Sequence, residues 1–278
     1  MPRLLRWSSA LVIFTSLAAC GMAEENLAVV ANAPGTFAVG DPQRLMVGLV
    51  DDETADFLAS PDLSAEAVIT SPDEEVTEVP AEFMWTVPDV VGLYLVRTTF
   101  DQAGTWWVRL RPEGLGPSQQ AAFTVSSNDV VPGVGDLAPA VKTSTLSDRP
   151  LAEISSDDEP NPDFYQMSLD DALGSGRPTV VVFATPAFCV SQTCGPMLDQ
   201  VKEVAPGHPD ANYLHVEIYE NLDARSADEL KVVPAVLAWG LPSEPWVFVI
   251  DAEGVVAARF EGAMMASELE VALEAVGA

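Results

Sequence analysis

The sequence predicts two domains, an all-β sandwich followed by an α/β fold. The chain has 278 residues, about the length at which one hydrophobic core gives way to two. Short apolar runs separated by turn signals fill residues 28–127, and no stretch of helical periodicity interrupts them. From residue 164 to residue 278, runs typical of strands alternate with runs typical of helices, which predicts a sheet covered by helices.

The first twenty residues predict a secretory signal peptide. Arg3 and Arg6 precede a mostly apolar run over 7–17, which is too short for a comfortable membrane span. The Leu-Ala-Ala-Cys sequence that ends at Cys20 resembles a bacterial lipobox, and the resemblance implies that Cys20 is lipidated. A plain secretory signal with an unrelated cysteine is the alternative. We therefore expect a protein anchored by lipid to the extracytoplasmic face of the cell membrane, with residues 21–27 as a tether.

Residues 28–127 are expected to form the β-sandwich. The candidate strands are 45–50, 92–100, 105–110 and 121–125. Trp106 and Trp107 are neighbours, so they point to opposite faces of a strand, and one of them is expected in the core. A Gly-Leu-Tyr run followed by a Gly-Thr-Trp run resembles the paired strands of immunoglobulin-like modules in exported bacterial proteins, which implies an immunoglobulin-like sandwich.

Residues 128–163 have the composition of a linker, with several prolines, acidic clusters and little periodicity. The second domain is then expected over 164–278. Its candidate helices are 168–174, 196–204, 226–231 and 267–276. Its candidate strands are 179–184, 212–219, 246–250 and 255–260.

Cys189 and Cys194 are the candidate reactive pair. If Cys20 is lipidated, they are the only two cysteines left to pair, in a compartment where disulfides persist. Five residues apart on a helix, two Cα atoms would lie about 8.7 Å apart, beyond the roughly 7 Å that a disulfide spans. If the pair bonds, residues 190–193 are therefore not regular helix, and the helix is expected to start near Pro196.

The order β-α-β-α-β-β-α, with a cysteine pair after one strand and a proline before a later one, resembles the thioredoxin family over roughly 164–278. The resemblance implies a thioredoxin-like fold in which Pro245 has a cis peptide bond and faces the cysteines. It also implies that Gly262 lines the substrate groove and that Phe188 is the aromatic residue before the nucleophile. Met264 follows Gly262 and is expected in the same groove.

The chain departs from the family in two ways. The spacing is Cys-x₄-Cys, so the family's nucleophile matches either Cys189 after Phe188 or Cys194 in Cys-Gly-Pro-Met197, and which cysteine attacks stays open. The family's buried acidic residue falls near Val182, so whether the chain is an efficient reductase also stays open. The candidate hydrogen-bond donors to a thiolate are Thr185, Ser191 and Thr193.

We predict thiol–disulfide exchange with thiols or disulfides of extracytoplasmic proteins. The alternatives are a non-enzymatic binding or assembly lipoprotein with a structural disulfide, and a copper-handling protein. Met264 and Met265 beside two thiolates could hold Cu(I), but such methionines more often line an apolar groove. His208 and His215 do not lie in the late loop that copper-carrying relatives use. We therefore expect neither a metal nor another cofactor.

The charge of the chain excludes nucleic acid as a partner. The formal net charge is −29, and without Arg3 and Arg6 the 11 basic residues face 42 acidic ones, which gives −31. Such a surface repels phosphate backbones and anionic lipid headgroups. The chain also has no Ser/His/Asp constellation and no phosphate-binding glycine loop, so hydrolase chemistry is not expected.

Overall fold

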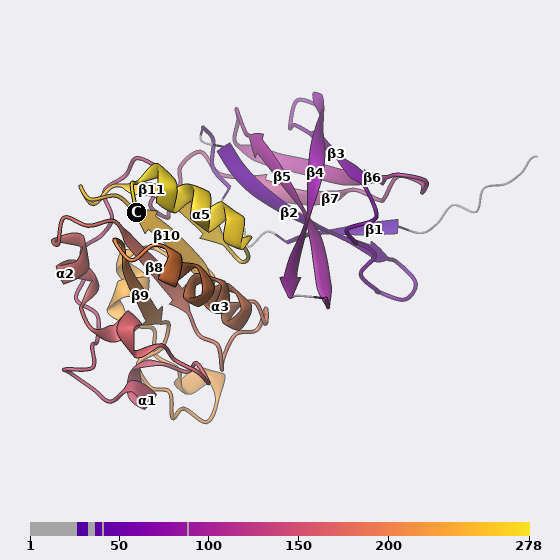
Figure 1. Cartoon of the computed structure of the whole chain (residues 1–278). Coiled ribbons are helices and arrows are strands. Elements are labelled where there is room, and N and C mark those ends of the chain that lie inside the picture. Colours follow the sequence, from indigo (N-terminus) through magenta and orange to yellow (C-terminus); the bar gives the residue numbers. More distant parts are fainter. Residues whose placement is uncertain (1–26, 33–36, 41, 88) are drawn as a thin grey trace, which may run out of the picture.

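The structure is a computed structural model that describes residues 27–32, 37–40, 42–87 and 89–278. Cys20, the predicted signal peptide and almost all of the predicted tether lie outside these residues. Figure 1 shows a strand-rich N-terminal part, followed by a part in which helices cover a second sheet.

The N-terminal part is one antiparallel sheet of seven strands. Its strands are β1 (Leu27–Asn32), β2 (Pro42–Asp51), β3 (Ala65–Thr70), β4 (Val76–Val87), β5 (Val91–Thr99), β6 (Gly104–Pro112) and β7 (Ala121–Val125), in the order β1-β2-β5-β4-β3-β6-β7. The first half of β4 pairs with β3 and its second half with β5, so this long strand joins the two halves of the sheet. The N–H of Gln119, just before β7, donates to the carbonyl of Leu27 in β1 at 2.7 Å, so the sheet nearly closes on itself.

The core of the N-terminal sheet is aromatic. Period-2 alternation points Trp106 inward and leaves Trp107 half-buried on the other face. Phe100 is fully buried and lies edge-on to Trp106 and Phe37, with ring centroids 5.0 and 5.6 Å apart. The expectation that one tryptophan fills the core is therefore confirmed, and that tryptophan is Trp106.

The second sheet has four strands in the order β11-β10-β8-β9. Its strands are β8 (Thr179–Ala184), β9 (Asn212–Glu217), β10 (Trp246–Ile250) and β11 (Val256–Glu261). β9 runs parallel to β8, whereas β10 is antiparallel to both β8 and β11. β8 and β10 are buried along their whole length, which fits their continuous apolar sequences in the middle of a sheet covered on both faces.

Short helices cover both faces of this sheet. They are α1 (Leu151–Ile154), α2 (Leu169–Leu173), α3 (Cys194–Val204), α4 (Pro234–Ala238) and α5 (Ala266–Ala275), with 3₁₀ turns at Pro162–Tyr165, Ala205–Gly207 and Ala227–Glu229. α3 and α5 share one apolar core with alternate residues of β8 and β10, while α2 and α4 pack on the opposite face. The beginning of α3 and the end of β8 therefore meet at one edge of the sheet.

The predicted fold class, a two-sheet sandwich followed by an α/β thioredoxin-like fold, is contradicted. The N-terminal strands form one nearly closed sheet, because β4 is long enough to pair on both sides. Only 18% of the described chain is helical, and three of the five α-helices have four or five residues. Apolar side chains are buried mainly by strands in both halves, so the protein is mostly β.

Residues 128–163, predicted as a linker, lie along the second sheet. The N–H groups of Gly135 and Ala138 donate to the carbonyls of Val256 and Gly254 at 2.9 Å each. Leu146 donates to the carbonyl of Tyr165 at 3.0 Å. The segment has little regular structure but many anchoring hydrogen bonds. The domain boundaries themselves stay predictions.

An apolar contact joins the two sheets. Four side chains of the N-terminal sheet pack against Ala263 and Met265, which precede α5: Met46, Met84, Leu93 and Leu95. Arg44 of β2 crosses the same junction and donates to both carboxylate oxygens of Glu268 at 3.0 and 2.7 Å, and to the carbonyl of Ala263 at 3.0 Å. The N-terminal sheet therefore covers the loop between β11 and α5.

Candidate disulfide site

The candidate site is the loop between β8 and α3. β8 ends at Ala184, α3 begins at Cys194, and Cys189 and Cys194 form a disulfide with their Cα atoms 6.0 Å apart. Gln192, between the two cysteines, has a φ of 60°. A left-handed residue does not fit a regular α-helix, so the expected break in helical structure over 190–193 is present. The helix starts two residues before the expected Pro196, with Cys194 as its first residue.

The two sulfurs differ in exposure. Cys194 is fully buried among apolar side chains of β8, α3 and α5. Cys189 is partly exposed, and the next residue, Val190, has 92% of its side chain exposed. Of the two cysteines, Cys189 is therefore the one with exposed surface, a difference that the sequence did not indicate.

Hydrogen-bond donors surround the Cys189 sulfur. The N–H of Cys194 points at this sulfur from 3.3 Å, and the Ser191 hydroxyl lies 3.2 Å from it. Ser191 in turn lies 2.8 Å from the Thr193 hydroxyl. Helix N-termini and hydroxyl donors favour a thiolate over a thiol, so this arrangement suits a negative charge on Cys189. Thr185, the third expected donor, is fully buried, and its hydroxyl has no hydrogen-bond partner within the described residues.

The predicted groove residues lie in the following places. Phe188 is half-buried and meets Tyr219 edge-on at 6.0 Å. The Glu244–Pro245 bond is cis, as the resemblance implied. Gly262 has a φ of 70°, which suits glycine, and its N–H donates to the carbonyl of Pro245 at 2.9 Å.

An open groove at Pro245 and Met264 does not fit the structure. Both residues are buried, and Met264 packs within the core shared by α3 and α5. The methyl group of Met46, from β2, lies 3.0 Å from where a Cβ on Gly262 would stand. The N-terminal sheet therefore occupies the space in which the sequence predicted a groove.

Sequence reasoning missed a polar cluster behind the loop. His215 and Glu217 are buried on the face of β9 that looks toward α3, and Tyr165 and Ser155 are buried beside them. Burial lowers the pKa of His215, outweighing the opposite effect of Glu217, and burial raises the pKa of Tyr165. The alternation of Tyr213, His215 and Glu217 along one strand face was the available signal.

The structure separates His208 from the cysteines. Its Nδ1 lies 3.0 Å from the carbonyl oxygen of Ala278, at the end of the chain. Among the residues that the structure describes, no group of three or more His, Cys, Asp or Glu side chains could hold a metal ion.

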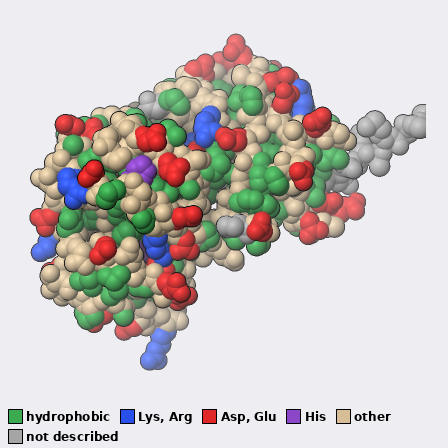
Figure 2. All heavy atoms as spheres, viewed as in Figure 1, with side chains coloured by type: hydrophobic (Ala, Val, Ile, Leu, Met, Phe, Trp, Pro, Cys, Tyr) green, Lys and Arg blue, Asp and Glu red, His purple; other side chains and the backbone are tan. Residues whose placement is uncertain are grey.

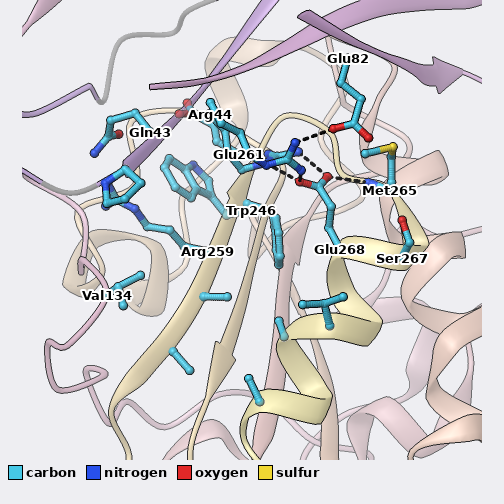
Figure 3. Close-up of a pocket in the computed structure, with 18 of the residues that line it drawn as sticks. Gln43, Arg44, Glu82, Val134, Trp246, Arg259, Glu261, Met265, Ser267 and Glu268 are labelled. Atoms are coloured by element: carbon cyan, nitrogen blue, oxygen red, sulfur yellow. Dashed lines mark hydrogen bonds and ion pairs between the residues drawn. The ribbon is translucent and has the colours of Figure 1, made fainter. Parts of the chain in front are cut away.

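A second candidate is a cavity of about 580 Å³ between the two sheets. Figure 3 shows Arg44, Glu82 and Glu268 meeting at its edge, with Trp246 and Arg259 along its wall. Arg97 pairs with Glu82 at 2.5 Å and with Glu268 at 2.6 Å, and Arg259 pairs with Asp129. The charged side chains that line this cavity pair with other side chains of the same protein. Such pairing is typical of a structural contact between two parts of a protein.

Glu268 is the centre of this junction. Its burial works to raise the pKa, but Arg44, the N–H of Met265 and Arg97 together hold the pKa of Glu268 below its ordinary value. Burial lowers the pKa of Arg44, and the facing Glu268 opposes that effect. Both side chains are mostly buried, with 16% and 10% of their surfaces exposed.

The surface of the molecule is acidic, as Figure 2 shows for one face. Acidic side chains are spread over both halves on this face, with few basic ones between them. Within the described ranges, no helix combines the length and apolar character needed to cross a bilayer.

Comparisons with known proteins show low similarity. No family model matches the chain, and no curated protein does. The crystal structure of the Lin-41 filamin domain is 16% identical and covers 38% of this chain and 96% of its own, with a TM-score of 0.26. The solution structure of a lipoprotein from Bacteroides thetaiotaomicron is 12% identical and covers 37% of this chain and 80% of its own, with a TM-score of 0.20.

Proposed function

We propose that the protein exchanges disulfides with the thiols of partner proteins through Cys189 and Cys194. The observation that carries the proposal is the asymmetry of the pair: Cys189 is partly exposed, and Cys194 is buried at the beginning of α3. Attack by a partner requires one reachable sulfur, and resolution requires a second sulfur held close to it. A disulfide that only crosslinks the fold does not need a reachable sulfur.

The exchange proceeds in two steps. A thiolate of the partner attacks the Cys189 sulfur, the bond to Cys194 breaks, and its electron pair leaves on Cys194, which takes up a proton. A second thiolate of the partner then attacks the partner sulfur of the mixed disulfide and releases Cys189. The partner's two thiols are oxidised to a disulfide and the protein's disulfide is reduced to two thiols. The same steps run in reverse when the reduced protein meets a disulfide.

Cys189 is the attacking sulfur of the reduced protein in this proposal. The N–H of Cys194 and the hydroxyl of Ser191 lie 3.3 and 3.2 Å from the Cys189 sulfur, where they can stabilise its thiolate. Burial in an apolar core disfavours a charged Cys194. This choice between the two cysteines is the one that the sequence left open.

Single-cysteine variants test the proposal. The substitution Cys20→Ser removes the third thiol from the full-length chain. Either Cys194→Ala or Cys189→Ala is then added to this variant. After reduction, each variant is mixed with oxidised glutathione, and the mixed disulfide is followed by mass. We expect the variant that keeps Cys189 to form it rapidly and the variant that keeps Cys194 to form it only on unfolding. Equal inertness of both variants would favour the alternative, a binding or assembly protein with a structural disulfide.

We also propose that Cys20 anchors the protein to the extracytoplasmic face of the membrane through lipid. The support is the Leu-Ala-Ala-Cys sequence after a short apolar run. Metabolic labelling with a radioactive fatty acid tests this. The wild-type chain should be labelled and sediment with membranes, and Cys20→Ala should be unlabelled. Equal labelling of both chains would contradict the anchor.

A further inference from the structure

A chain of hydrogen bonds connects the cysteine loop to a buried carboxylate. The N–H of Ala187, two residues before Cys189, donates to the Ser156 hydroxyl at 3.2 Å. The N–H of Ser156 donates to one oxygen of Glu217 at 2.9 Å, and the N–H of Ile218 donates to the other at 2.9 Å. Only 5% of Glu217 is exposed. These hydrogen bonds link the backbone of the cysteine loop to β9.

A second chain of hydrogen bonds holds the residue at which the loop begins. His215 Nε2 lies 3.0 Å from the carbonyl oxygen of Ala184. A carbonyl only accepts, so Nε2 carries the proton and Nδ1 is left as an acceptor. The Tyr165 hydroxyl lies 2.5 Å from Nδ1 and 2.8 Å from the Ser155 hydroxyl. Ser155 and Ser156 are neighbours in the sequence, and each takes part in one of the two series of hydrogen bonds.

Burial of the Glu217 carboxylate and the His215 imidazole costs free energy of folding, so stability alone does not explain these groups. Removing a carboxylate and an imidazole from water is unfavourable unless every polar atom finds a partner, and apolar residues of similar size often stabilise a core as well or better. Among the described residues, both series of hydrogen bonds end at the loop that carries Cys189. The arrangement specifies the loop conformation, which apolar packing would leave less defined.

We propose that Ser156 and Glu217, supported by Tyr165 and His215, are positioning residues that set the reactivity of Cys189. They hold the loop so that the Cys189 sulfur faces the N–H of Cys194 and the Ser191 hydroxyl. The inference rests on the proposed function, since positioning matters only if Cys189 reacts. The other charged groups at this cluster are Asp157 and Lys202, which pair with each other at 2.6 Å.

The test measures the reactivity of Cys189 directly. In the reduced full-length chain with Cys20→Ser and Cys194→Ala, Cys189 is the only thiol, and its alkylation rate by iodoacetamide is recorded against pH. Adding Ser156→Ala should raise the pH midpoint of alkylation by about 0.4 to 1 unit, the equivalent of one net hydrogen bond. Glu217→Gln should move the midpoint in the same direction, and Ser156→Thr, which keeps the hydroxyl, should restore it.

Ser118→Ala is the matched control. Its hydroxyl also accepts a backbone N–H, from Leu110 at 2.9 Å, but within the N-terminal sheet. It should lower the midpoint of urea unfolding as Ser156→Ala does and leave the alkylation profile unchanged. A Ser156→Ala profile that coincides with the parent, or equal shifts in both variants, would overturn the inference. Because the readout needs no partner, it stays decisive even if the intact disulfide proves inert and the proposed function fails.

Discussion

The two halves of the described chain bury different kinds of side chain. The N-terminal core is formed by aliphatic and aromatic residues such as Phe37, Phe100 and Trp106. The core behind the cysteine loop includes His215, Glu217 and Tyr165 with their hydrogen bonds. An apolar core is sufficient for stability, whereas buried polar groups placed beside a reactive pair suit a chemical task. In the proposed function, the first half contributes stability and the second half contributes the chemistry.

The largest expected effect is in the N-terminal core. Phe100→Ala removes a fully buried ring that touches Phe37, Trp106 and Phe123, and should lower the free energy of unfolding by about 3–5 kcal/mol. Urea unfolding of the oxidised chain measures the loss. The alkylation profile of Cys189, recorded in the single-thiol background under native conditions, should not change. A shift in that profile would show that the two halves are not separate in function.

The junction between the halves should depend on one ion pair. Arg44→Met leaves Glu268 with Arg97 as its only basic partner in a mostly buried site, and should cost about 3 kcal/mol of unfolding free energy. Arg111→Met removes one member of an exposed pair with Glu78 and should cost less than about 1 kcal/mol. Equal losses in the two variants would mean that the junction contributes no more than the surface does.

Opening the disulfide should have an intermediate effect. Reduction releases a loop of six residues and should lower the free energy of unfolding by about 2 kcal/mol, because the unfolded chain gains freedom. Urea unfolding with and without a dithiol reductant gives the difference. A loss near the whole stability of the protein would instead assign the pair to folding.

The smallest effect is a dependence of stability on pH just below 6.5. His215 is neutral in the folded state because burial lowers its pKa, whereas the unfolded chain binds a proton near the ordinary value of 6.5. Stability is therefore present above pH 6.5 and falls below it, by up to about 1.4 kcal/mol for each pH unit. The pKa of Glu268 is held below its ordinary 4.5, so its contribution disappears only at lower pH.

His215→Gln should flatten the dependence just below pH 6.5 and leave the loss below pH 4.5 in place. Urea unfolding at half-unit pH steps makes the comparison. A slope that persists unchanged in this variant would assign the dependence to another group.

The sequence predicted the local elements of the second half better than those of the first. The continuous apolar runs at 179–184 and 246–250 coincide with β8 and β10, because central strands bury both faces. β4 was not predicted, since its first half alternates exposed Glu78 and Pro80 with Val79 and Ala81. The one-turn helix α4 was also missed, because five residues carry too little periodicity.

The cysteine pair was predicted from the sequence and the cis bond at Pro245 from the resemblance, but the surroundings of the site were predicted by neither. Met46 and its neighbours cover the loop that carries Gly262, Ala263 and Met265, some two hundred residues away in the chain. The contact between Ala187 and Ser156 joins the cysteine loop to a segment whose composition indicates only a linker. Such long-range contacts leave no periodic pattern in either partner.

A redox titration of the oxidised full-length chain against dithiothreitol and glutathione buffers tests the central claim most directly. If Cys189 and Cys194 exchange with partner thiols, the pair equilibrates with these buffers at a midpoint above about −300 mV, where extracytoplasmic thiol couples can act on it. A pair that stays oxidised below that potential and does not react with dithiols in the folded state would contradict the account.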